Sequence, residues 1–149
     1  MKAVGYYTPG DLDRDDALID LELPRSEVGP SDLLVRVAAV AVNPVDTKIR
    51  RNRAPEQGQA GVLGWDAVGV VEAVGSQVSG FANGDRVYYA GAINRAGSNA
   101  EFQVVSLASL ASSAARLPPT CPAPRMMIFI RRSLFPQQCS PLQQVCRQS

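Results

Sequence analysis

A valine-rich run interrupted by glycines is the feature that most constrains how this chain can fold. Valine favours a pleated, half-buried surface, and a glycine inside such a run marks a bend, a bulge or a close approach of two backbones. Five glycines interrupt the segment 64–84, namely Gly64, Gly69, Gly75, Gly80 and Gly84. Strands that bend this often are typical of a small barrel rather than of a broad open sheet.

Alternating apolar and polar residues, bounded by turn signals, place the other strands. Strands are expected at residues 1–7, 17–23, 33–42, 86–90 and 99–105 and within the glycine-interrupted run 64–75. The apolar run 33–42 is long enough for a buried strand or a buried helix, and its β-branched content favours the strand. In the last strand, Ala100, Phe102 and Val104 alternate with Glu101 and Gln103, which is the period of a strand with one buried face.

One short helix is expected directly after the strand at 33–42. Asn43 can cap its start, Pro44 suits its first position, and Asp46 faces the positive end of the helix dipole. Six or seven strands, one or two short helices and no regular βαβ alternation predict a mainly β fold, a partly open barrel.

Length and composition limit the class of protein. A chain of 149 residues has room for one domain with a core, and its 46% hydrophobic and 19% charged residues are those of a globular protein. A net charge of +1 gives no general case for binding nucleic acid or a membrane surface. The chain has three cysteines without metal-type spacing, no signal-like N-terminus and no apolar run of membrane length, so a cytoplasmic location is expected.

Composition changes sharply near residue 106. Residues 1–111 hold all 14 acidic residues, whereas residues 112–149 hold five arginines, no acid, every cysteine and more than half of the prolines. We therefore expect a folded unit at 1–105 and an atypical tail at 106–149 that is disordered or encoded out of the family's reading frame.

Four blocks of sequence occur in an order that one enzyme superfamily shares. They are residues 43–47 (NPVDT), the glycine pattern at 64–78, residues 80–87 and residues 97–102 (GSNAEF). Together they resemble the medium-chain dehydrogenase/reductase superfamily, which includes the zinc-type alcohol dehydrogenases and their quinone reductase relatives. The residues in these blocks are most similar to those of the zinc-type alcohol dehydrogenase-like proteins.

The resemblance implies a GroES-like catalytic domain, which in relatives precedes a Rossmann domain that binds NAD(P)H. It further implies hydride transfer from NADPH to a small quinone, carbonyl or activated alkene, and a possible homodimer in full-length relatives. The chain has no G-x-G-x-x-G fingerprint between a strand and a helix. A Rossmann domain is therefore expected to be absent, and this chain to be truncated and inactive alone.

The resemblance also supplies candidate site residues. Asn43 stands where the zinc enzymes have a cysteine ligand, and Trp65 and Asp66 stand where they have a His-Glu pair. The chain has no histidine and no cysteine before residue 121, so a catalytic zinc is not expected. The pattern is similar to the zinc-independent quinone reductases, in which the Asn and Asp matched by Asn43 and Asp46 line the pocket. Asn43, Asp46, Trp65 and Asp66 are thus the catalytic candidates.

Each candidate also has a structural interpretation. Asn43 can be only a helix cap, and Asp46 can serve only to stabilise the helix N-terminus. Trp65 can be a core aromatic residue, and Asp66 can be the buried partner of an arginine.

The basic segment 48–53 leaves a similar choice. Lys48 is the weak candidate for binding a cofactor phosphate, but a solvated face is the simpler interpretation of Lys48, Arg50, Arg51 and Arg53. Two other functions remain open for the whole chain, a GroES-like binding or assembly module and a non-functional remnant.

Overall fold

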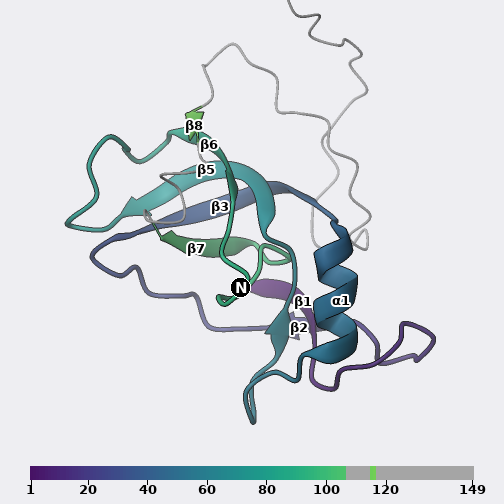
Figure 1. Cartoon of the computed structure of the whole chain (residues 1–149). Coiled ribbons are helices and arrows are strands. Elements are labelled where there is room, and N and C mark those ends of the chain that lie inside the picture. The colour runs from purple at the N-terminus through teal and green to yellow at the C-terminus, as the bar shows by residue number, and fades with distance from the viewer. Residues whose placement is uncertain (107–114, 117–149) are drawn as a thin grey trace, which may run out of the picture.

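The computed structural model describes residues 1–106 and 115–116, which form two antiparallel sheets and one helix (Figure 1). The elements are β1 (Lys2–Tyr6), β2 (Ile19–Glu22), β3 (Asp32–Ala41), α1 (Pro44–Asn52), β4 (Gly61–Val62), β5 (Asp66–Val74), β6 (Arg86–Ala90), β7 (Phe102–Ser106) and β8 (Ala115–Arg116). Apart from β8, the predicted tail lies outside the described residues. No helix in the described ranges is long and apolar enough to cross a membrane.

The smaller sheet has the strand order β2-β1-β4 and the larger has the order β7-β3-β5-β6-β8. Every pairing between these strands is antiparallel. A βαβ unit needs parallel strands, so the described residues contain none. The mainly β fold with one short helix is confirmed, and its sheets are open rather than joined into a closed barrel.

The two longest strands, β3 and β5, form the centre of the larger sheet (Figure 1). Their pairing confirms that the run at 33–42 is a strand. The register shifts twice, between Leu34 and Val35 and between Val37 and Ala39, so that the pair bends. A Cβ on Gly69 would lie 2.3 Å from the Arg36 carbonyl oxygen, which explains a glycine at this position in β5.

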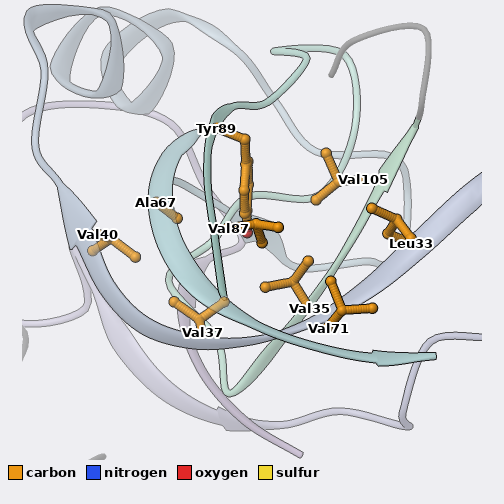
Figure 2. Close-up of a cluster of buried hydrophobic side chains, with 9 residues drawn as sticks. All are labelled: Leu33, Val35, Val37, Val40, Ala67, Val71, Val87, Tyr89 and Val105. Atoms are coloured by element: carbon orange, nitrogen blue, oxygen red, sulfur yellow. The ribbon is translucent and has the colours of Figure 1, made fainter. Parts of the chain in front are cut away.

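The main core lies on one face of this sheet. Figure 2 shows β-branched and aromatic side chains from β3, β5, β6 and β7 that converge there. Its members are Leu33, Val35, Val37, Val40, Ala67, Val71, Val87, Tyr89 and Val105. Six of these nine residues are valines and one is a tyrosine. The core is thus built mainly from residue types that favour strands.

The predicted alternation in the last strand agrees with the burial of Ala100 but is wrong for Phe102, Gln103 and Val104. Gln103 is buried with Val105, whereas Phe102 and Val104 are only half-buried. The Gln103 amide can lie in the core because it is satisfied there: the Tyr89 hydroxyl donates to Oε1 at 2.8 Å, and Nε2 donates to the Ala96 carbonyl at 3.0 Å.

The interpretation of residues 48–53 as a solvated basic face is also wrong for one member. Arg50 is 1% exposed. Its Nε donates to the Ala17 carbonyl at 2.6 Å, and its Nη1 donates to the carbonyls of Thr8 and Gly10 at 3.0 and 3.2 Å. The guanidinium also stacks on the Tyr6 ring, 4.7 Å from its centroid. Backbone carbonyls at Nε and Nη1, together with the aromatic face, thus replace part of the water that a solvated arginine would have, while Nη2 is buried without a hydrogen-bond partner.

Candidate active site

Two short segments bring the predicted site residues together. The first, residues 43–46, comprises the residue before α1 and the first turn of that helix, and the second, residues 64–66, leads from β4 into the first residue of β5. The antiparallel pairing of Ala41 with Asp66 places the end of β3 beside the start of β5. Candidates that are about twenty residues apart in the sequence are therefore neighbours in space.

The centre of the site is a hydrogen bond between two predicted residues. The Asn43 side-chain Nδ2 donates to Oδ2 of Asp66 at 2.7 Å, and both residues are half-buried. The side-chain partner of Asp66 in this bond is thus an amide, whereas the structural interpretation of Asp66 was an arginine partner. An amide beside a carboxylate can orient a polar substrate atom through its remaining donor and acceptor positions.

Asp46 lies beneath this pair and is 6% exposed. Its Oδ2 accepts from the Asn43 backbone N–H at 2.6 Å, and its Oδ1 accepts from the Gly64 backbone N–H at 2.9 Å. Asn43 is the N-cap of α1, with the extended backbone expected there, and Pro44 opens the helix. The sequence signal for a helix start therefore coincides with the site.

Gly64 has little room around it. Its φ is +87°, and a Cβ there would lie 2.6 Å from Oδ1 of Asn99 and 2.8 Å from Oγ of Ser98. Both of those oxygens are buried and lack a hydrogen-bond partner, so they face the Cα of Gly64. Sequence reasoning did not single out Ser98 and Asn99 as neighbours of the site, although both belong to the block at 97–102.

Trp65 is 4% exposed and packs in a cluster of apolar residues. The cluster comprises Tyr6, Leu63 and Trp65, with Val45 and Ile49 packed against it. The indole Nε1 donates to the Arg95 carbonyl at 3.2 Å. Trp65 is therefore a buried core residue next to Asp66 in the chain, held by this cluster and by its bond to Arg95.

Lys48 lies exposed on α1. In the part of the chain that the structure describes, no hydrogen bond or ion pair joins its side chain to Asn43 or Asp66. The structure therefore brings Asn43, Asp46, Trp65 and Asp66 together and leaves Lys48 at the surface.

The residues at the site do not fit a zinc ion. Within residues 1–106 and 115–116, no group of three or more His, Cys, Asp or Glu side chains is gathered. The Asn43 amide nitrogen and the Trp65 indole nitrogen both act as hydrogen-bond donors here. Zinc needs lone pairs from thiolate, imidazole or carboxylate ligands, and these two nitrogens offer none.

Known proteins similar to this chain include alcohol dehydrogenase-like proteins and quinone oxidoreductases. A zinc-type alcohol dehydrogenase-like protein of Staphylococcus aureus is 42% identical over 113 residues, which is 76% of this chain and 33% of that protein. The structure of a putative zinc-dependent alcohol dehydrogenase from Rhizobium etli is 46% identical, with a TM-score of 0.74 over 81% of this chain and 34% of that one.

A third similar protein is described together with its cofactor. The Escherichia coli quinone oxidoreductase complexed with NADPH is 28% identical, with a TM-score of 0.65 over 79% of this chain and 33% of that one. The chain spans about a third of the length of the relatives that it matches. Residues 29–113 match the family described as the alcohol dehydrogenase GroES-like domain. The chain therefore belongs to this family, within the medium-chain dehydrogenase/reductase superfamily.

Proposed function

We propose that this domain forms the substrate side of an NAD(P)H-dependent oxidoreductase that reduces a small quinone, carbonyl or activated alkene. The observation that carries the proposal is the hydrogen bond between Asn43 and Asp66. It joins the two segments at which zinc relatives are expected to bind their metal. Similarity to quinone oxidoreductases, one of them complexed with NADPH, supports the reaction class.

When bound, NAD(P)H supplies a hydride to the substrate. The residues of this domain orient the substrate. The Asn43 side-chain amide donates to a substrate oxygen with the hydrogen that Asp66 does not use, and Asp66 holds that amide in one orientation. Trp65, the neighbour of Asp66 in the chain, keeps the start of β5 in place, because its ring is buried and its indole N–H is bonded to the Arg95 carbonyl.

The reaction proposed here is independent of zinc. A donor such as Asn43 stabilises negative charge that develops on a substrate oxygen, which is the task that the metal performs in zinc dehydrogenases. We further propose that Lys48, exposed on α1, contacts a cofactor phosphate. A cytoplasmic location and a homodimeric full-length form belong to the same proposal.

The test uses a chimera, because the chain spans only a third of its relatives' length. Residues 1–106 replace the matching domain of the Rhizobium etli protein, and NADPH oxidation is followed with a quinone as acceptor. We expect activity that survives a metal chelator. Asn43→Ala and Asp66→Ala are each expected to reduce kcat about 10²-fold, by analogy with the loss of one oxyanion donor.

Two results would contradict the proposal. One is a chimera that is folded but transfers hydride only after zinc is added. The other is unchanged activity in both variants, with Lys2→Ala as the surface control. The 149 residues alone are expected to show little activity, and saturable NADPH binding by them would contradict this expectation.

A further inference from the structure

Asp46 differs from Asn43 and Asp66, the other polar candidates, in the hydrogen bonds that its side chain makes. Both of its oxygens accept from backbone N–H groups, at 2.6 Å from Asn43 and 2.9 Å from Gly64. The residue is 6% exposed. A carboxylate that is buried and engaged on both oxygens has little capacity left for a substrate.

The same carboxylate joins the two segments that form the site. Asn43 belongs to the first segment and Gly64 to the second. The bond from Asp46 to Gly64 and the bond from Asn43 to Asp66 connect these segments at two points. The backbone at both ends of the Asn43–Asp66 hydrogen bond is therefore fixed within two residues by Asp46.

Only a carboxylate of this length satisfies both backbone donors. An asparagine at position 46 has one acceptor oxygen, so one of the two N–H groups would lose its partner and would face an NH₂ group instead. A buried donor without a partner is unfavourable by about 1–3 kcal/mol, so the segments would move apart to reach water.

We infer that Asp46 is a positioning residue: its carboxylate holds the Asn43 and Gly64 backbones so that the Asn43 amide meets Asp66. The role is hierarchical. Asp46 determines the Asn43–Asp66 hydrogen bond, whereas that bond does not determine the contacts of Asp46. This assignment rests on the proposed function for its catalytic meaning, but the hierarchy itself is a property of the folded chain.

The test compares wild type and Asp46→Asn in the 149-residue chain by nuclear magnetic resonance. The readout is hydrogen exchange of the Asn43 side-chain amide. We expect exchange about tenfold faster or more in the variant, as befits a lost hydrogen bond to a charged group. Emission from Trp65, the single tryptophan, should shift as well, because Trp65 lies between Gly64 and Asp66.

Val105→Ala is the matched control. It removes volume from the main core and lowers global stability without touching either segment. We expect it to leave exchange at Asn43 unchanged under native conditions. If Asp46→Asn and Val105→Ala have the same effect on Asn43, the role of Asp46 is merely structural and the inference is overturned.

A second variant keeps the inference testable if Asp46→Asn does not fold. Asp66→Asn removes the carboxylate that accepts from the Asn43 side chain and leaves Asp46 intact. The hierarchy predicts that the backbone N–H groups of Asn43 and Gly64 keep their wild-type exchange rates in this variant. Faster exchange at both would show that the two bonds depend on each other, and would overturn the hierarchy. Neither experiment needs cofactor or turnover, so an inactive chimera would refute the proposed function alone.

Discussion

The guanidinium of Arg95 binds the carboxylate of Asp32 through two parallel hydrogen bonds. Nη1 donates to Oδ1 and Nη2 donates to Oδ2, each at 2.9 Å, between residues 63 positions apart in the sequence. The same residue, Arg95, accepts through its carbonyl from the Trp65 indole. The loop after β6 is therefore bonded both to the start of β3 and to Trp65, the residue before Asp66.

This pair makes stability depend on pH. The hydrogen bond from Arg95 holds the pKa of Asp32 below its ordinary value of 3.8, although partial burial opposes the shift. A carboxyl whose pKa is lower in the folded state stabilises the fold above its unfolded value and loses that contribution as pH falls. Asp32→Asn should therefore reduce the free energy of unfolding at neutral pH and have less effect in acid.

We expect a loss of about 1 kcal/mol at pH 7, because Arg95 is partly solvated and the pair is screened. Urea unfolding at several pH values measures it. The exposed Asp16, paired with Arg14 at 2.6 Å, provides the control variant Asp16→Asn, for which a smaller loss is expected. A gap between wild type and Asp32→Asn that stays constant from neutral to strongly acid pH would exclude the assigned role.

Gly64→Ala should be among the most destabilising single-methyl additions. The alanine would have to keep the φ of +87° that Gly64 has, and its Cβ would lie 2.6 Å from Oδ1 of Asn99. Strain and overpacking together suggest a loss of about 2–4 kcal/mol. Thermal or urea unfolding checks this value.

Gly58→Ala is its matched control. Gly58 also has a positive φ, of +78°, but a Cβ there would have no atom within 4 Å. We expect only the backbone strain, about 1 kcal/mol. Equal losses in the two variants would mean that crowding by Asn99 and Ser98 does not constrain Gly64.

Arg50→Lys should destabilise the chain although it keeps the charge. A lysine has no planar fork with which to reach the carbonyls of Thr8, Gly10 and Ala17 together. Hydrogen bonds from a charged group suggest a loss of about 2–4 kcal/mol.

Proteolysis within the segment 8–17 should be faster in this variant, because Arg50 holds that segment to α1. Arg51→Lys is the control. Arg51 is 66% exposed on its side chain and pairs with Asp11, so its replacement should change stability by no more than about 0.5 kcal/mol. Equal protease sensitivity in both variants would contradict the role of Arg50.

Local sequence signals predicted the parts of the fold that local chemistry determines. The Asn43-Pro44 start of the helix and the β-branched run of β3 were both confirmed. The meeting of Asn43 with Asp66 was accessible only through the family resemblance, because strand register between distant segments is not written in either segment. The two-residue β4, which pairs with Gly5 and Tyr6, has too few residues to show any period.

Polar residues with long-range partners could not be predicted. Gln103 and Arg50 look like surface residues by type, yet both are buried. Their burial depends on acceptors and donors from remote segments, such as the Tyr89 hydroxyl for Gln103 and the Ala17 carbonyl for Arg50. A hydrogen bond of this kind compensates the buried side chain for its lost hydration, and it forms only once the remote segments have come together in the fold. Periodicity therefore assigns such residues to the wrong face.

The burial of the Tyr89 hydroxyl predicts that the folded chain loses stability in alkaline solution. Burial raises the pKa of its hydroxyl above the ordinary value of 10.0, and burial also raises the pKa of Tyr6 despite the opposing charges of Arg50 and Arg53. A group whose pKa is raised in the folded state contributes stability below its unfolded pKa, and that contribution is lost as pH rises through about 10 and beyond. Ultraviolet titration of the four tyrosines should therefore show a delayed phenolate step that coincides with unfolding.

Tyr89→Phe should reduce the absorbance amplitude of that delayed step. Tyr88→Phe should leave this amplitude unchanged, because Tyr88 is 43% exposed on the same strand. Tyr89→Phe also leaves Gln103 Oε1 without its donor at 2.8 Å, so at neutral pH it should lower the free energy of unfolding by about 1–3 kcal/mol. If all four tyrosines ionised together while the circular dichroism stayed native, water would have to reach Tyr89 in the folded state. The buried link between β6 and Gln103 of β7 would then not exist in solution.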